Sequence, residues 1–342
     1  MKIKRKIKVL IVDDSMLFRE TLAKAIARDP AIEVVAKASD PYEARDLILK
    51  HEPDVMTLDV ELPRMNGIEF LKKLMPQYPI PVIVVSSISD SIFDALDAGA
   101  VDFVVKPNLR IGQPIDSMVN ELVIKIKIAS TVKVGHWKND MASRIFHSPK
   151  TDLSKIVAIG ASTGGTEALA SLLKALPREM PGIVIVQHMP PVFTKMYAER
   201  LNNSCSLEVK EAATGDEVYP GKVLIAPGDY HMVLKKKSNT YYVDCYKGEK
   251  VSGHCPSVDV LFNSVAEHAK AKAVGVILTG MGADGAQGLL KMRQAGARTI
   301  GQDEESSIVY GMPKVAYEIG AVERQASLAN IPNLLYNLVN EG

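Results

Sequence analysis

The sequence is poor in cysteine and in long apolar runs. Only three cysteines occur in 342 residues, and none forms a Cys-x-x-Cys pair. This odd, scattered set predicts neither a disulfide framework nor a zinc site, and free thiols fit a reducing cytoplasm. No apolar run approaches the roughly 20 residues that span a bilayer, and the apolar stretch near the N-terminus is too short for a signal peptide. We therefore expect a cytoplasmic protein that is not embedded in a membrane.

A charge excess of either sign is also missing. Lysine and arginine number 41 against 40 aspartates and glutamates, so the net charge is +1. A general nucleic-acid binder would carry a basic excess, and we therefore expect no nucleic-acid partner. The hydrophobic fraction of 47% and the charged fraction of 24% are typical of a folded globular chain. A length of 342 residues indicates two or three domains.

The first 130 residues alternate between short apolar runs and helical segments. The expected strands cover residues 8–12, 32–38, 55–60, 81–86 and 102–105. A first helix follows Ser15, where Leu17, Leu22, Ala25 and Ile26 recur near the helical period. Further helices are expected at residues 41–51, after 66–67, at 91–98 and at 115–129. Such alternation predicts an α/β domain, with a doubly wound parallel sheet of five strands and helices on both faces.

Polar side chains gather where these strands end. Asp13 and Asp14 follow the first strand, Asp59 ends the third, Ser86 ends the fourth and Lys106 follows the fifth. The carboxyl ends of parallel strands share one edge of the sheet, so these groups should converge there. Clustered carboxylates repel one another unless a cation lies among them, and Mg²⁺ prefers such hard oxygen ligands. A carboxylate beside Mg²⁺ and a lysine can act as a nucleophile toward phosphorus.

The segments VLIVDDS, LDVELPRMNG, VIVVSS and FVVKP carry a resemblance to a known family. Over about residues 6–130 the chain resembles the receiver domain of two-component response regulators, which has a flavodoxin-like fold. The resemblance implies that Asp59 accepts a phosphoryl group from a histidine kinase. It also implies that Mg²⁺ is bound by Asp14, Asp59 and the carbonyl of Glu61, with Asp13 helping through water.

The same resemblance assigns three supporting residues. Ser86 and Lys106 would contact the phosphoryl group, and Phe103 would occupy the aromatic switch position. Relatives often carry tyrosine at that position. Phenylalanine has no hydroxyl, so a hydrogen bond made there by tyrosine would be lost.

The alternation stops after this domain. We expect a receiver domain at residues 1–130, a basic polar linker at 131–151 and a second domain at 152–342. The single tryptophan, Trp137, lies in the linker, where it could dock on one domain or lie in solvent.

The second domain opens with a strand at residues 156–159 and the turn GASTGG, which places Ser162 in a G-x-S-x-G pattern before a helix from about Thr166. Such a strand-to-helix turn exposes a serine at a helix N-terminus. A glycine-rich turn after a strand could equally cradle a phosphate or a dinucleotide. The spacing G-x-x-x-G-G and the missing Walker lysine argue against both.

Two further strand ends suggest partners for Ser162. His188 follows a strand at residues 182–187, and Asp284 lies in the turn TGMGADG after a strand at 274–278. A neutral imidazole can take the proton of a serine hydroxyl when a carboxylate orients it. We expect the amides of Thr163 and Met281 to stabilise the oxyanion. The order Ser, His, Asp differs from that of α/β-hydrolases.

Spacing alone leaves alternatives open. His231 and His254 compete for the role of base, and Asp216, Asp229 and Asp259 compete for that of the carboxylate. The output domain could also be a DNA-binding transcription factor, although no pair of short helices with basic recognition positions is evident. A nucleotide-binding output that uses GASTGG as a phosphate cradle is the other alternative.

The segments GASTGGTEAL, VQHMPPVFT, APGDYHM, PSVDVLF and LTGMGADGA resemble the CheB-type chemotaxis receptor methylesterases over about residues 152–340. The resemblance implies a mostly parallel α/β domain without a cofactor, and it places the triad on Ser162, His188 and Asp284. One departure is the pair His254-Cys255, where a basic residue next to the proline is expected in many relatives.

The two resemblances together imply a phosphorylation-regulated hydrolase for adaptation in chemotaxis. It would demethylate glutamate methyl esters and deamidate glutamines on methyl-accepting chemoreceptors, with release of methanol or ammonia. A chemotaxis histidine kinase would be the phosphodonor, and the enzyme would be recruited to receptor arrays in the cytoplasm. We expect the unphosphorylated receiver to shield the esterase and phosphorylation to activate it.

Overall fold

The computed structural model describes residues 5–87, 91–107, 115–132 and 152–341. The chain divides into two compact units, residues 1–137 and 138–342. Most of the expected linker, including Trp137, lies outside the described residues, so the linker stays a prediction. Among the described residues, no helix is both long enough and apolar enough to cross a membrane.

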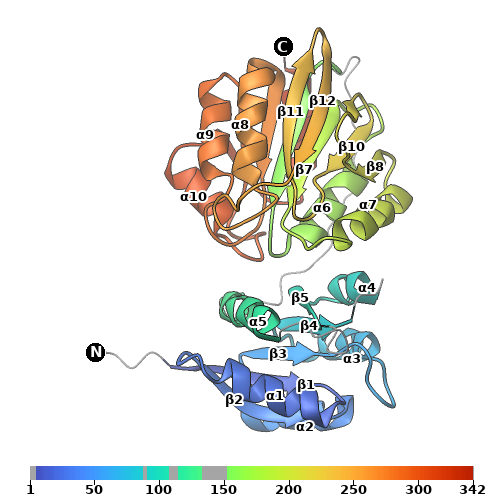
Figure 1. Cartoon of the computed structure of the whole chain (residues 1–342), viewed down its shortest axis with the longest axis vertical. Coiled ribbons are helices and arrows are strands. Elements are labelled where there is room, and N and C mark those ends of the chain that lie inside the picture. The colour runs from blue at the N-terminus through green and yellow to red at the C-terminus, as the bar shows by residue number, and fades with distance from the viewer. Residues whose placement is uncertain (1–4, 88–90, 108–114, 133–151, 342) are drawn as a thin grey trace. The chain divides into compact units, whose positions relative to one another are not determined.

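The N-terminal unit contains a five-stranded parallel sheet in the order β2-β1-β3-β4-β5 (Figure 1). Its strands are β1 (Ile7–Val12), β2 (Ile32–Ala38), β3 (Val55–Leu58), β4 (Val82–Ser86) and β5 (Asp102–Val105). Its helices are α1 (Met16–Ile26), α2 (Pro41–His51), α3 (Gly67–Leu74), α4 (Ser91–Asp97) and α5 (Ile115–Ala129). This strand order confirms the doubly wound fold that the sequence predicts.

Local signals set where the helices of this unit begin. Ser15 precedes α1 and its hydroxyl accepts a hydrogen bond from the Phe18 amide at 3.3 Å. Asp40 caps α2 in the same way, and Asn66 caps α3. The expectation that Leu17 belongs to the apolar face of α1 is wrong, since Leu17 is 78% exposed. It lies about 140° around the helix from Leu22, which is buried, so the two cannot share one face.

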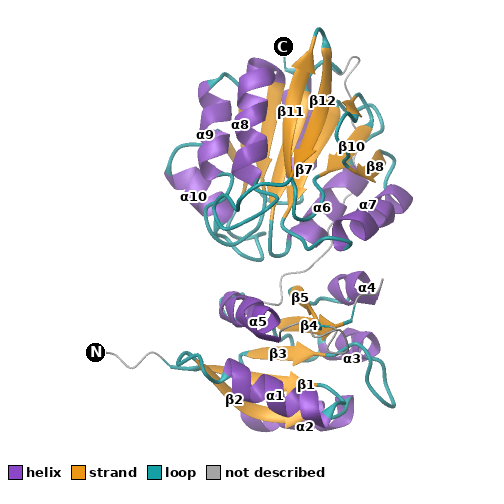
Figure 2. Cartoon of the chain, in the orientation of Figure 1, coloured by secondary structure: helices purple, strands orange, loops and turns teal. Residues whose placement is uncertain are grey.

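The C-terminal unit is built on a seven-stranded, all-parallel sheet in the order β15-β14-β13-β6-β7-β10-β8. Its strands are β6 (Ile156–Ala161), β7 (Gly182–Gln187), β8 (Glu208–Glu211), β10 (Lys222–Ile225), β13 (Ala273–Ile277), β14 (Arg298–Gln302) and β15 (Arg324–Ala326). A separate antiparallel sheet, β11-β12-β9, consists of β9 (Glu217–Val218), β11 (His231–Lys237) and β12 (Thr240–Tyr246). The long hairpin of β11 and β12 stands out in Figure 2. The predicted mostly parallel α/β domain is confirmed.

Helices surround the larger sheet. They are α6 (Gly165–Ala175), α7 (Phe193–Ser204), α8 (Val258–His268), the short 3-10 helix η2 (Lys270–Lys272), α9 (Ala286–Gln294), α10 (Met312–Glu318) and α11 (Ile331–Asn340). Every residue of β6 and β7 is buried, as expected of parallel strands covered on both faces.

Helix α8 packs directly on the centre of this sheet. Its buried residues Val258, Leu261, Phe262 and Val265 recur at helical spacing. A side chain at Gly160 of β6 would overlap Val258, so the close approach of helix and strand depends on this glycine. The N-terminus of α8 is thereby brought to the carboxyl end of β6.

Candidate active site

The three predicted triad residues come from three neighbouring strands. Ser162 follows β6, His188 follows β7, and Asp284 lies in the turn between β13 and α9. β6 lies between β7 and β13 in the sheet. The chain therefore leaves β6 toward one side for β7 and later returns to its other side for β13. Such a switch point at the carboxyl end of a parallel sheet is where ligands bind in open α/β folds.

Asp284 is buried at the N-terminus of α8. Its Oδ2 accepts hydrogen bonds from His188 Nε2 and the Val258 amide, both at 2.8 Å. Its Oδ1 accepts from the Ser257 hydroxyl at 2.7 Å and from the Asp259 amide at 3.0 Å. The free amides and the positive dipole end of a helix favour an anion at this place.

These donors decide the charge state of the carboxyl group. Burial acts to raise the pKa of Asp284, but the hydrogen bonds from His188, the Asp259 amide and Ser257 outweigh it and hold the pKa below its ordinary value of 3.8. Asp284 is therefore ionised at neutral pH and presents a fixed negative charge to the imidazole.

The contact with Asp284 also decides which nitrogen of His188 is basic. An ionised carboxylate only accepts hydrogen bonds, so Nε2 of His188 carries the proton in this pair. The other ring nitrogen, Nδ1, is buried and has no hydrogen-bond partner among the described residues. The free lone pair of Nδ1 is thus the site that can take a proton, whereas the familiar serine-protease arrangement uses Nε2 for that task.

Ser162 is held by its backbone on the neighbouring strand end. Its amide donates to the Thr279 carbonyl at 3.0 Å, and its carbonyl accepts from the Gly165 amide at 2.7 Å. Gly164, at φ 76°, closes the turn into α6 in a conformation that favours glycine. No hydrogen bond joins Ser162 to His188 within the part of the chain that the structure describes, so that contact stays a prediction.

The turn that contains Met281 lies against Ser162. A Cβ atom added to Gly280 would come within 2.7 Å of the Ser162 Cβ, so only glycine allows this approach. Met281 follows it and is 46% exposed, while Thr163 beside the serine is buried. Both residues flank Ser162, and their role in stabilising an oxyanion remains a prediction.

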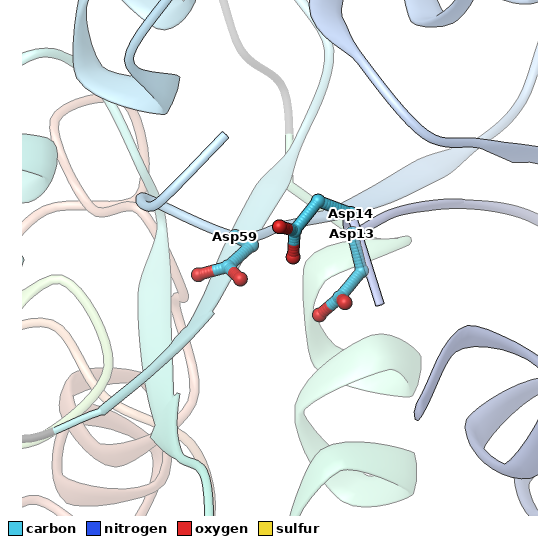
Figure 3. Close-up of side chains that lie close together, drawn as sticks. All are labelled: Asp13, Asp14 and Asp59. Carbon is cyan, nitrogen blue, oxygen red and sulfur yellow. The ribbon is translucent and has the colours of Figure 1, made fainter. Parts of the chain in front are cut away.

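A second cluster lies in the N-terminal unit. Asp13, Asp14 and Asp59 each offer a carboxylate oxygen, and these oxygens lie within 4.8 Å of one another (Figure 3). Lys106 Nζ lies 2.7 Å from Asp13 Oδ2 and 2.5 Å from Asp59 Oδ2. Three carboxylates face one ammonium group, which leaves negative charge for a divalent cation with a preference for oxygen ligands.

The surroundings of Asp59 fit a phosphorylation site. Burial raises the pKa of Asp59 and the charge of Asp13 adds to this, whereas Lys106 opposes it. Ser86 Oγ is buried at the end of β4 and has no hydrogen-bond partner among the described residues. A buried hydroxyl without a partner is costly, and an oxygen of a phosphoryl group would satisfy it.

Two further residues with predicted receiver roles are Glu61 and Phe103. The Glu61 amide donates to Asp59 Oδ1 at 3.2 Å, which places Glu61 beside the cluster. Phe103 is 4% exposed and its ring lies 5.2 Å from Lys125 Nζ. Magnesium ligation by the Glu61 carbonyl and switching by Phe103 remain predictions.

Two protein families match this chain. The response regulator receiver domain matches residues 9–111, and the CheB methylesterase family matches residues 157–335. A protein-glutamate methylesterase/protein-glutamine glutaminase 2 from Syntrophomonas wolfei is 61% identical over 339 residues, which cover 98% of this chain and 99% of that protein. The chain belongs to the CheB methylesterase family.

More distant relatives agree with this membership. The protein-glutamate methylesterase/protein-glutamine glutaminase of Salmonella typhimurium is 46% identical over 342 residues and 98% of each chain. The crystal structure of the Thermotoga maritima CheB methylesterase catalytic domain matches with 42% identity and a TM-score of 0.52, and covers 54% of this chain and 97% of that one. A DNA-binding output and a nucleotide-binding output, the alternatives left open by the sequence, find no support.

In this CheB-family chain, neither rival histidine is placed as the base. His231 is fully buried and uses both ring nitrogens, since Nε2 donates to the Glu249 carbonyl at 2.8 Å and Nδ1 accepts from the Ser257 amide at 3.2 Å. Burial lowers the pKa of His254 to about 4, which makes it a weak base at neutral pH.

The rival carboxylates are engaged elsewhere or exposed. Asp216 pairs with Lys210 at 2.8 Å, and Asp259 accepts a hydrogen bond from the Gly288 amide at 2.7 Å. Asp229 is exposed on a loop. Asp284 alone among the described carboxylates is hydrogen-bonded to His188.

Two supporting residues of the CheB-family site escaped the sequence analysis. Gln187 is buried, and its Nε2 donates to the Ser162 carbonyl at 2.9 Å and to the His188 carbonyl at 3.1 Å, so one side chain ties together the turns that carry both residues. Ser257 donates to Asp284, and its position directly before an apolar helical repeat was a readable N-cap signal. Nothing in the sequence marks the contacts of Gln187.

We expect Ser257→Ala to lower the free energy of unfolding of the catalytic domain by about 1.5–3 kcal/mol at pH 7, as for a lost hydrogen bond to a charged group. Because the pKa of folded Asp284 lies below its ordinary value of 3.8, the ionised form contributes stability that is present above that pH and is lost as the pH falls through the folded pKa. The deficit of the variant should therefore shrink below about pH 4.

Denaturant unfolding of both proteins between pH 3 and pH 7 measures this deficit. Ser206→Ala, which removes an exposed hydroxyl shortly after α7, is the matched control and should leave stability unchanged. An equal deficit for Ser257→Ala at both ends of the pH range would show that its hydroxyl does not act on the ionised carboxylate.

Proposed function

We propose that this chain is a phosphorylation-regulated protein-glutamate methylesterase and protein-glutamine glutaminase that acts on chemoreceptors. The hydrogen-bonded pair of His188 and Asp284, one strand away from Ser162, carries this proposal. Full-length similarity to proteins of that name supports it. The receptors are the substrates, a chemotaxis histidine kinase is the phosphodonor, and the enzyme works at receptor arrays in the cytoplasm.

Ester cleavage starts at the Ser162 hydroxyl. Nδ1 of His188 takes the proton of Ser162 Oγ as Oγ attacks the carbonyl carbon of a methylated glutamate. Asp284 stabilises the imidazolium through Nε2, and the amides of Thr163 and Met281 stabilise the oxyanion. The imidazolium then gives its proton to the departing methanol.

Water completes the reaction. His188 takes a proton from water as the oxygen of water attacks the glutamyl ester on Ser162, and the proton returns to Ser162 Oγ as free glutamate leaves. A glutamine side chain follows the same steps with ammonia as the first product. The chain's own residues and water handle every proton transfer, so the catalytic domain needs no cofactor.

The receiver acts through Asp59, whose carboxylate attacks the phosphorus of the donor. Mg²⁺, when bound, neutralises charge on the carboxylates and the phosphoryl oxygens. Asp14, Asp59 and the Glu61 carbonyl would hold the ion, with Asp13 helping through water. Lys106 and the Ser86 hydroxyl contact the phosphoryl oxygens, while Phe103 responds at the switch position.

Phosphorylation then relieves inhibition of the esterase. The phosphoryl group carries about −1.5 to −2 charges and replaces the single charge of the Asp59 carboxylate, so negative charge increases at a group that is already among carboxylates. This increase changes the relative stability of two receiver states. In the unphosphorylated state the receiver restrains the catalytic domain, and the phosphorylated state releases it.

Ser162→Ala tests the proposed chemistry. Methanol release from methylated receptor membranes should fall by about 10³-fold or more, because the variant lacks the proposed nucleophile that forms the acyl intermediate. A serine-directed phosphonate should label the native chain at Ser162 and leave the variant unlabelled. Ser204→Ala is the matched control and should release methanol at the native rate. Release from Ser162→Ala near the native rate would contradict the assignment.

Asp59→Asn tests the regulation. A small phosphodonor with Mg²⁺ should increase methanol release by the native chain and leave the variant at its basal rate. Removal of Mg²⁺ with a chelator should abolish the increase. Asp46→Asn, at an exposed position of α2, should respond like the native chain. An increase in the Asp59→Asn variant would place the phosphoryl group elsewhere.

Deletion of residues 1–150 tests inhibition by the receiver. The remaining chain should release methanol several-fold faster than the unphosphorylated full chain, because the restraining domain is gone. Its rate should not respond to the phosphodonor. A truncated, folded chain without a gain in rate would count against inhibition.

A further inference from the structure

A second histidine ring lies flat against His188. The ring centroids of His188 and His254 are 3.7 Å apart and the ring planes differ by 9°. His254 belongs to the segment between β12 and α8, which is remote from β7 in the sequence. The proposed mechanism gives this ring no task, although it covers a face of the proposed base.

The backbone around His254 is firmly held. Val251 and His254 exchange two hydrogen bonds of 3.0 Å between their amides and carbonyls. Ser252 at φ 53° and Gly253 at φ 84° form the tight turn between them, which requires positive φ at both central residues. Three residues later, Ser257 donates to Asp284. One short segment thus presents a ring to His188 and a hydroxyl to its carboxylate partner.

The charges around His254 favour a neutral ring. The ionisable groups that act on it are His188, Asp284 and Lys250. Burial lowers the pKa of His254 to about 4, His188 and Lys250 act in the same direction, and Asp284 opposes them. His254 is therefore uncharged at neutral pH and can lie against His188 without repelling the imidazolium that forms during the reaction.

We propose that His254 is a positioning residue that locks the ring orientation of His188. The hydrogen bond to Asp284 fixes Nε2, but a half-turn about the Cβ–Cγ bond would break that bond and exchange Nδ1 for a carbon atom. Such a turn passes through an orientation perpendicular to the stack, and a ring only 3.7 Å away leaves no space for it. The stack therefore keeps Nδ1 available for Ser162.

This inference rests on the proposed function and deepens it. If the flat shape of the His254 ring holds His188 in place, phenylalanine at this position should preserve that function, and alanine should not. Alanine opens space beside His188, so the imidazole samples non-productive orientations and kcat should fall about 10- to 100-fold, with KM changed less than about 2-fold. Phenylalanine should restore most of the lost kcat.

Full-length chains with His254→Ala and His254→Phe are compared with the native chain in methanol release and in the nitrogen NMR signals of His188. Native His188 and His254→Phe should show one tautomer with the proton on Nε2, and His254→Ala should show averaged signals. His268→Ala, at the end of α8, is the matched histidine control and should match the native chain in both measurements. His254→Leu replaces the alanine variant if the latter does not fold.

Native kcat in His254→Ala, or a loss in His254→Phe as large as in His254→Ala, would overturn the proposal. An unchanged single tautomer of His188 in His254→Ala would overturn it as well. The NMR measurement needs no substrate. If the native chain released no methanol, the proposed function would fail, whereas the ring orientation of His188 would still be decided.

Discussion

The site depends on a buried carboxylate that remains ionised. Water does not solvate Asp284, and burial of an unpaired charge is costly. Two amides of α8 and the hydroxyl of Ser257 offset this cost by donating hydrogen bonds to Asp284. The close packing of α8 on β6, which Gly160 allows, brings these donors to the carboxylate. Helix packing in the domain core therefore determines the charge that orients His188.

The two acidic sites of this chain balance charge in different ways. The donors around Asp284 come from the fold itself, so that site is organised before substrate arrives. Within the described part of the receiver, Lys106 is the one ammonium group in contact with Asp13 and Asp59, and the Ser86 hydroxyl has no hydrogen-bond partner there. A bound cation would offset the remaining carboxylate charge of that cluster, and a phosphoryl group would give the Ser86 hydroxyl a partner. A site completed by its ligand is well suited to report whether the ligand is present.

The sequence predicts positions along strands better than it predicts contacts between elements. Polar residues at the ends of apolar runs meet at one sheet edge, and this indicates Ser162, His188 and Asp284 as candidates. It leaves rival histidines and carboxylates open, and the family resemblance selects among them. The nitrogen of His188 that faces Asp284 and the two bonds of Gln187 depend on how turns approach one another, and no local pattern encodes this. Leu17 was misplaced for a related reason, because apolar spacing indicates a helix without fixing which side of it is covered.

A neutral His254 also fits the charge balance of the reaction. The proposed mechanism starts from an uncharged His188, so before attack Asp284 carries the negative charge of the site and His254 adds none. In the tetrahedral intermediate, the imidazolium of His188 offsets the oxyanion, so the net charge of the site is the same as before. A low-dielectric interior penalises a change in net charge more than a displacement of charge within it. A permanently cationic side chain in place of His254 would disturb this balance and oppose protonation of His188, whereas a neutral flat ring confines that imidazole and adds no charge.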